Sequence, residues 1–350
     1  MSPNFGQDII MKIFYGLLVA SACLASCYKF TAVDSATTDA GDSGPKTPDK
    51  GDGSTESGGP IQQTTADNLG LQVSYIDSLT WNADSLYFTE PYDTKPVIVK
   101  YTPASNSTME YVYPTTGAPL GITNDGKTSD LIFAASPTDS KGAIWRVPAG
   151  LDTEQTKAAS QINVGTASWY SPNEVVVRPT DGMIYVTDPG YQLSSDANGV
   201  YRVDPTGAVS TVATFSGDQP NGIALSPDSG TLYVSLTERD KAKTPSIVKF
   251  TVNADGSTSD SVKFVDMPND SLPDGLAVDT EGNVFAATQT GVQVFAQDGH
   301  PWGTITVPAP ATLVTNVAFG DADLKTLYIA TDDGLFKARV NFAGLSYMSQ

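Results

Sequence analysis

The 350-residue chain carries 39 acidic and 20 basic side chains, a formal net charge of −19 at neutral pH. This charge argues against nucleic acid as a partner, because the protein and the phosphate backbone would repel each other. Both cysteines, Cys23 and Cys27, lie near the N-terminus, so the rest of the chain has no disulfide, thiol nucleophile or cysteine-held metal. His300 is the single histidine, which argues against Ser-His-Asp catalysis and against a histidine-based zinc site.

Residues 1–26 have the pattern of a secretory signal peptide. Lys12 precedes the apolar run 13–20, which is shorter than the about 20 residues that a membrane-spanning helix needs. Residues 1–10 add nothing to this pattern, so we expect the true start of translation at Met11.

The run ends in Leu24-Ala-Ser-Cys27, which resembles the bacterial lipobox. The resemblance implies that Cys27 is the lipidated first residue of an exported lipoprotein, held at the membrane of the cell envelope by its acyl chains. Tyr28 replaces the aspartate that commonly retains lipoproteins at an inner membrane, which favours the outer membrane if the host has one. The alternative is an ordinary cleaved signal with a chance cysteine.

Residues 27–67 differ in composition from the rest of the chain. From Thr31 onward they are rich in Ser, Thr, Asp, Gly and Pro, and Val33 and Ile61 are their only large aliphatic residues. Such a segment buries too little apolar surface to offset its ordering entropy. We therefore predict that residues 27–67 form a disordered acidic tether in front of a domain over residues 68–345.

Six similar units fill the predicted domain, and no stretch has a sustained helical period. Their second strands begin at Leu86, Leu131, Ile184, Leu232, Val284 and Leu327, which are 43 to 53 residues apart. Branched and aromatic runs separated by Pro-Asp and Asp-Gly turns indicate strands. Repeats of this length predict an all-β, six-bladed β-propeller. We expect residues 69–75 to add the outer strand that closes the ring.

Three units open with similar short sequences: Ser-Pro-Asn173, Pro-Asn221-Gly and Pro-Asp274-Gly. Strand openings on separate blades converge on the channel of a propeller, so we expect these three side chains to be neighbours. Carboxylate and amide oxygens are the ligands that calcium prefers. The alternative is that Asn-Gly and Asp-Gly only form tight turns.

The stretch from Ser171 to Tyr191 and the openings at Pro220 and Pro273 resemble the gluconolactonase / senescence-marker-protein (regucalcin) / LRE-like family, over about residues 70 to 340. The resemblance implies a six-bladed propeller with one divalent ion in its channel. This ion is usually Ca²⁺, with Zn²⁺, Mg²⁺ or Mn²⁺ as alternatives. Many members of the family hydrolyse sugar lactones.

The resemblance also implies roles for single residues. Asn221 and Asp274 match an Asn and an Asp that bind the ion in the family, and Asn173 matches a nearby Asn that contacts the ion or the substrate. Asp274 is also the expected general base, or the group that orients the attacking water.

Three positions depart from the family pattern. Asp77, four residues before Trp81, stands where the family has a longer Glu ligand. Leu120 stands where it has an Asn, and Glu174 where it commonly has an Asp. The leading hypothesis is a membrane-tethered, calcium-dependent lactone hydrolase that acts as a monomer on a small-molecule lactone. The alternative, favoured by Asp77 and Leu120, is a non-catalytic propeller that binds a protein or glycan of the cell envelope.

Overall fold

The computed structural model describes residues 58–345, with gaps at 94, 115–116, 137–140, 166–168, 191–197, 238–242 and 269–270. The predicted signal peptide, Cys27 and residues 27–57 of the predicted tether lie outside the described residues. No helix within these described ranges has the length and apolar character needed to cross a lipid bilayer.

Five antiparallel sheets are formed by strands that follow one another in the chain. The first comprises β2 (Leu79–Asn82), β3 (Ser85–Glu90), β4 (Val97–Thr102) and β5 (Ser107–Val112); the second β6 (Ala118–Asn124), β7 (Leu131–Ser136), β8 (Ala143–Val147) and β9 (Ser160–Gln161); the third β10 (Val175–Val177), β11 (Ile184–Asp188), β12 (Asn198–Val203) and β13 (Val209–Phe215). The fourth comprises β14 (Gln219–Leu225), β15 (Thr231–Thr237), β16 (Ser246–Thr251) and β17 (Val262–Asp266), and the fifth β18 (Leu276–Val278), β19 (Val284–Thr288), β20 (Gly291–Phe295) and β21 (Pro301–Ile305). One short 3₁₀ helix, Thr156–Ala158, lies between β8 and β9.

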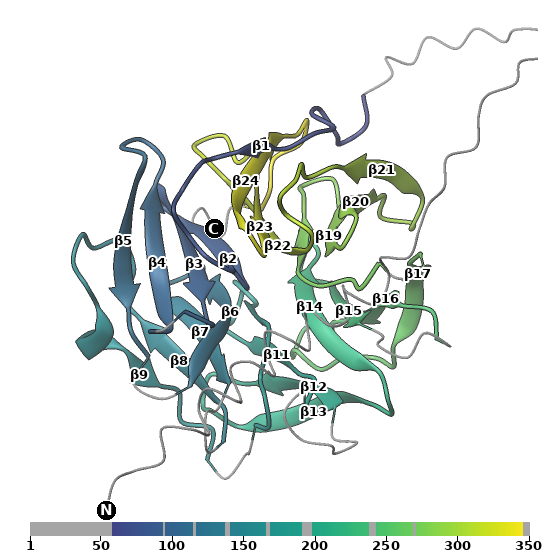
Figure 1. Ribbon diagram of the computed structural model, residues 1–350. Helices are drawn as coiled ribbons and strands as arrows, with labels where there is room; N and C mark the ends of the chain where they lie inside the picture. The colour runs from purple at the N-terminus through teal and green to yellow at the C-terminus, as the bar shows by residue number, and fades with distance from the viewer. Residues whose placement is uncertain are drawn as a thin grey trace, which may run out of the picture. The chain divides into compact units, whose positions relative to one another are not determined.

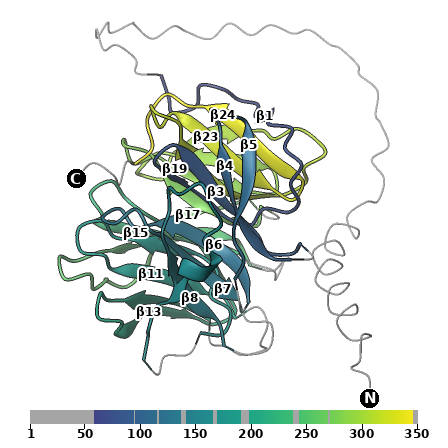
Figure 2. The same ribbon diagram turned by 90° about the vertical axis from the view of Figure 1, so that its left-hand side faces the viewer.

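The sixth sheet joins the two ends of the domain. It contains β22 (Val314–Gly320), β23 (Thr326–Thr331), β24 (Gly334–Arg339) and, as its outer strand, β1 (Asp67–Asn68). In Figure 1 the six sheets follow one another around a ring, from blue through green to yellow. Figure 2 shows the blue strands β3–β5 close to the yellow strands β23 and β24, where the ring closes. The prediction of a six-bladed propeller is confirmed.

The closing strand lies earlier in the chain than predicted. Asp67 pairs with Lys337 and Asn68 with Phe336, whereas we expected residues 69–75 to form this strand. Leu69, Leu71 and Val73 instead pack against the apolar core between the last and first blades, because their side chains are the first aliphatic cluster after the polar segment.

Residues 58–66 also belong to the propeller. Ile61 forms a β-bridge with Val340, and the Ala66 N–H donates to the Thr306 carbonyl at 2.8 Å. The structure therefore places within the domain a stretch that the sequence analysis assigned to the tether. Its polar composition hid this, because Ile61 and Ala66 supply its contacts with the apolar core and backbone hydrogen bonds with neighbouring strands hold the polar residues between them.

Aromatic side chains of the second strands fill the space between blades. Five of them occupy equivalent positions in the register of their strands and are at most 2% exposed: Tyr87, Tyr185, Tyr233, Phe285 and Tyr328. Each packs with inner-strand residues of the next blade; Tyr185, for example, lies in one apolar cluster with Ile223 and Leu225. Inter-blade packing therefore fixes the inner strands, and with them the residues that begin those strands.

Candidate active site

The register between the inner strand and the second strand aligns the six blades residue by residue. In every blade the same inner-strand position pairs with the same second-strand position: Leu79 with Phe88, Ile122 with Phe133, Val175 with Val186, Ile223 with Val234, Leu276 with Ala286, and Val317 with Ile329. The residues just before these inner-strand positions are therefore structurally equivalent.

Two rings of residues follow from this register. The mouth ring lies two positions before the aligned pairs and consists of Asp77, Leu120, Asn173, Asn221, Asp274 and Thr315. The floor ring lies one position before them and consists of Ser78, Gly121, Glu174, Gly222, Gly275 and Asn316. The four predicted ion-binding residues Asp77, Asn173, Asn221 and Asp274 thus occupy equivalent positions at one end of the channel.

Hydroxyl groups at the ends of second strands hold the mouth ring in place. Thr187 Oγ1 donates to the Asn221 carbonyl at 2.7 Å, and Ser235 Oγ donates to the Asp274 carbonyl at 2.8 Å. Each bond joins one blade to the inner strand of the next, because the hydroxyl belongs to the preceding blade. Thr187 and Ser235 are therefore inter-blade ties, whereas Thr288 and Thr331, at the ends of β19 and β23, donate within their own blades.

Asn221 has a carbonyl oxygen that no protein group satisfies. Its side chain is 6% exposed, and Nδ2 donates to Thr237 Oγ1 at 3.2 Å. This bond orients the amide and leaves Oδ1 buried without a hydrogen-bond partner in the described part of the chain. An unsatisfied buried oxygen costs about 1–3 kcal/mol. A cation would satisfy it.

The Asp77 carboxyl group has a raised pKa. The side chain is half-buried, and desolvation raises its pKa to about 7, although a hydrogen bond from Tyr75 opposes the rise. Burial also raises the pKa of Glu174 well above its ordinary value, and the charge of Asp77 raises it further. Two carboxyl groups therefore share one poorly solvated region, where a bound cation would favour their ionised forms.

The floor ring contains a contact across the channel. Asn316 Nδ2, on the sixth blade, donates to Glu174 Oε1 at 2.7 Å, on the third, and to Ser78 Oγ at 3.1 Å. Glycines leave room for these long side chains: a Cβ on Gly121 would lie 2.8 Å from Glu174 Oε2, and one on Gly275 would lie 2.2 Å from Asn316 Cγ. Glu174, Asn316 and Ser78 therefore close the channel below the mouth ring.

Sequence reasoning missed this floor. Glu174 was noted only as a departure from an expected Asp, and neither Ser78 nor Asn316 was assigned a role. The available signal was their place one residue after the predicted ring positions in Asp77-Ser78, Asn173-Glu174 and Thr315-Asn316. Reading it required the register that aligns the blades.

The donor set fits a hard cation. No three His, Cys, Asp or Glu side chains gather closely enough to hold a metal ion by themselves, within the ranges that the structure describes. Amide oxygens such as Asn221 Oδ1 must therefore complete any site. All-oxygen sets that mix carboxylates and amides suit calcium or magnesium better than softer metals.

A cavity of about 280 Å³ continues the channel below the floor ring. Inner-strand residues line it, most of them apolar, with Glu174 and Asn316 at one end and Leu345 at the other. The C-terminal segment crosses this lower end: the Thr280 N–H donates to the Ala343 carbonyl, and the Gly344 N–H to that of Leu324, both at 2.8 Å. The mouth ring is therefore the side from which we expect a substrate to enter.

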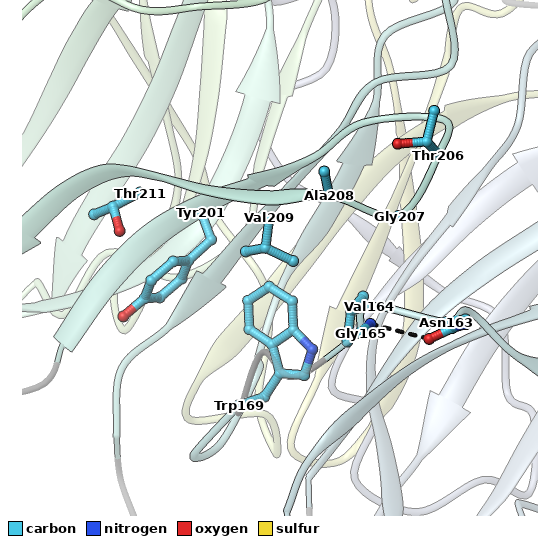
Figure 3. A pocket seen from close by; sticks show the side chains of 10 residues that line it. All are labelled: Asn163, Val164, Gly165, Trp169, Tyr201, Thr206, Gly207, Ala208, Val209 and Thr211. Carbon is cyan, nitrogen blue, oxygen red and sulfur yellow. Dashed lines mark hydrogen bonds between the residues drawn. The ribbon is translucent and has the colours of Figure 1, made fainter.

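A larger hollow, of about 680 Å³, lies away from the channel. It is formed by β12, β13 and the turn between them, together with residues 163–165 and Trp169, and none of its lining side chains is charged. Figure 3 shows the Trp169 ring beside Val209, with Tyr201 on the same wall; the two aromatic rings are 5.4 Å apart. This hollow contains none of the predicted site residues, so its size does not make it the candidate active site.

Comparison with known proteins finds relatives that are named as lactonases. The chain is 32% identical over 190 residues to a gluconolactonase from Zymomonas mobilis subsp. mobilis, a match covering 50% of this chain and 51% of that protein. It is 34% identical over 167 residues to a pentonolactonase from Haloferax volcanii, covering 46% of this chain and 53% of that protein. The chain thus spans about half the length of these curated relatives.

A solved structure extends the comparison to the whole propeller. The gluconolactonase from Xanthomonas campestris superposes with a TM-score of 0.66 at 25% identity, over 81% of this chain and 91% of that one. The family model described as SMP-30/Gluconolactonase/LRE-like region matches residues 77–333, starting at the first mouth-ring residue. The chain therefore belongs to the SMP-30/gluconolactonase/LRE-like family.

Proposed function

We propose that the protein is a calcium-dependent lactone hydrolase whose active site is the mouth ring. The observation that carries the proposal is Asn221 Oδ1, a buried oxygen without a partner among the described residues, at a position equivalent to those of Asp77, Asn173 and Asp274. Lactone hydrolysis is the activity that the names of the relatives share.

Each polar side chain named here has a separate role in this proposal. Asp77, Asn221 and Asp274 would hold the ion, and Asn173 would contact the ion or the substrate. A bound calcium ion supplies Lewis acidity, worth several kcal/mol toward negative charge on a carbonyl oxygen. Asp274 accepts a proton from the water that adds to the lactone carbonyl carbon. The ring C–O bond then breaks, and Asp274 returns the proton to the ring oxygen, which leaves as a hydroxyl group on the open hydroxy acid.

The test is bound calcium and lactone turnover, measured on the purified wild-type protein and on Asp274→Ala. We expect one tightly bound divalent ion and hydrolysis of a lactone in the wild type. The variant should keep its circular dichroism spectrum, lose the ion and lose about 100- to 10,000-fold in rate. Unchanged turnover in Asp274→Ala would contradict the assignment.

A non-catalytic binding module is the second candidate. It is supported by Leu120, which interrupts the polar ring, and by Asp77, which is shorter than the Glu expected there. This candidate predicts a folded protein that binds no divalent ion and opens no lactone, and that captures an envelope partner with or without calcium.

We also propose that the protein is anchored in the bacterial cell envelope through a lipid on Cys27, and that it works there as a monomer. The support is the lipobox-like Leu24-Ala-Ser-Cys27. Cys27→Ser should move the protein from the membrane fraction to the soluble fraction, and mass spectrometry should find acyl chains on the wild type alone. Equal membrane retention of both proteins would contradict the anchor.

A further inference from the structure

Leu120 is the one apolar residue of the mouth ring. It lies between Asp77 and Asn173 in the order of the blades, and the other five positions carry Asp, Asn or Thr. The side chain is 4% exposed, yet it belongs to none of the apolar clusters that the described residues of the blades form. None of these apolar clusters therefore accounts for its burial.

The backbone places Leu120 at the position in the second blade that Asn221 occupies in the fourth blade. In β6 the register shifts between Pro119 and Ile122, and in β14 it shifts between Pro220 and Ile223, so both strands carry the same bulge. Bulges re-aim side chains and occur often beside active sites.

The hydrogen bonds that the backbone carbonyls of Leu120 and Asn221 accept agree with this equivalence. The Leu120 carbonyl accepts from Thr89 Oγ1 at 2.8 Å, as the Asn221 carbonyl accepts from Thr187 Oγ1 at 2.7 Å. The leucine side chain thus occupies the place of an amide that the fourth blade presents to the mouth ring.

No other group on this bulge replaces the missing amide. Pro119 and Gly121 have no polar side chain, and the Gly121 N–H already donates to the Asn173 carbonyl at 2.6 Å. The Leu120 carbonyl is occupied by Thr89. The sector of the mouth ring that belongs to the second blade therefore offers a substrate hydrocarbon contact and no side-chain hydrogen bond.

We propose that Leu120 determines substrate specificity: the enzyme prefers lactones that present hydrocarbon, rather than a hydroxyl group, to the second blade. This inference rests on the proposed function. A hydroxyl group facing Leu120 would lose its hydrogen bonds to water without replacement, whereas an alkyl or unsubstituted ring carbon would gain apolar contact. Substrates with a hydroxyl on every ring carbon are correspondingly disfavoured.

The experiment compares two lactones of equal ring size, glucono-1,5-lactone with several hydroxyl groups and δ-hexalactone with an alkyl substituent. The kcat/KM of each is divided by its spontaneous hydrolysis rate, and the ratio of the two is measured in wild type and Leu120→Asn. We expect the wild type to favour δ-hexalactone, and Leu120→Asn to shift the ratio about 10- to 100-fold toward gluconolactone. Leu120→Met, which keeps an apolar side chain, should leave the ratio near that of the wild type.

Leu324→Asn is the matched control, since Leu324 lines the cavity on the other side of the floor ring and the change is chemically the same. Its ratio should equal that of the wild type. If Leu120→Asn does not fold, Leu120→Ala replaces it and should lower turnover of δ-hexalactone about 10-fold while sparing gluconolactone.

The outcomes separate the two proposals. Turnover of both lactones with the same ratio in wild type and in the folded Leu120 variant overturns the specificity role alone. No turnover of any lactone by a folded, calcium-loaded wild type overturns the proposed function, and this inference with it.

Discussion

The mouth ring and the floor ring are adjacent layers of the same inner strands, yet they are built on opposite principles. In the mouth ring the side chains are short and mostly polar, and at least one oxygen, Asn221 Oδ1, has no hydrogen-bond partner in the part of the chain that the structure describes. In the floor ring three positions are glycine, and the long side chains of Glu174 and Asn316 meet over them. The mouth ring leaves at least one oxygen available to a ligand, whereas the polar side chains of the floor ring hydrogen-bond to one another.

This difference predicts separate roles for the two rings: the mouth ring would bind a ligand, and the floor ring would stabilise the fold. The side chains of Leu120, Asn221 and Asp274 can change without disturbing the blades, because a hydroxyl of the preceding blade holds the backbone carbonyl of each. A floor-ring residue has close neighbours on another blade. Substitutions in the mouth should therefore alter binding, and substitutions in the floor should alter stability.

The floor glycines give the largest expected effect. A Cβ on Gly222 would lie 2.0 Å from the Asp274 carbonyl oxygen and 2.8 Å from Gly275 Cα, and backbone atoms cannot yield easily. We expect Gly222→Ala to lower the free energy of unfolding by about 3 kcal/mol. Urea denaturation measures this change. Gly58→Ala, whose nearest atom would be 3.8 Å away, is the control and should be neutral. Equal stability of both variants would contradict the tight floor.

The raised pKa of Asp77 predicts that the stability of the metal-free protein depends on pH. The folded state holds this proton up to about pH 7, whereas an unfolded chain releases it near pH 4. Stability should therefore fall as pH rises across this interval, by roughly 2 kcal/mol once partial exposure to channel water is allowed for. Unfolding in a chelator at pH 4.5 and 8 measures the loss, and Asp77→Asn should reduce it. A loss equally large in the variant would assign the effect to other groups.

Glu174 tests whether the floor depends on the hydrogen bond across the channel. Glu174→Ala leaves the buried Asn316 Nδ2 with Ser78 Oγ as its remaining acceptor, so we expect a loss of about 1–2 kcal/mol. Glu174→Gln keeps an acceptor and should cost less than half of that. Thermal unfolding in chelator compares them, and equal losses would mean that the charge rather than the bond matters.

Thr237 gives the smallest effect. Its hydroxyl orients the Asn221 amide and also donates to the Pro273 carbonyl of the next blade, so Thr237→Val should weaken calcium binding about 10-fold and lower the free energy of unfolding by about 1 kcal/mol. Calorimetric titration measures the affinity. Thr331→Val, which removes a hydroxyl of the sixth blade that bonds to the Gly334 carbonyl, should bind calcium as the wild type does. A similar loss in both would point to a general loosening of the ring.

The sequence predicted the blades well, because each unit repeats the same strands and turns. The equivalence of Asn173, Asn221 and Asp274 also followed, since Pro precedes each of them. The floor was not predictable in this way, because Glu174 and Asn316 are 142 residues apart and meet only across a closed ring. The closing strand was placed too late because backbone pairing by polar residues leaves no apolar pattern to read.

Residues 58–68, which pair with the last blades, determine which part of the propeller carries a pulling force applied from the N-terminal side. A pull from the N-terminal side reaches the blades through bonds such as Ala66 N–H to the Thr306 carbonyl and Leu69 N–H to that of Leu335. The load therefore falls on the outer edges of the fifth and sixth blades, far from the channel axis. Under a pulling force from the N-terminal side, these outer edges should separate before the strands that begin at the mouth ring, so the mouth ring should keep its geometry.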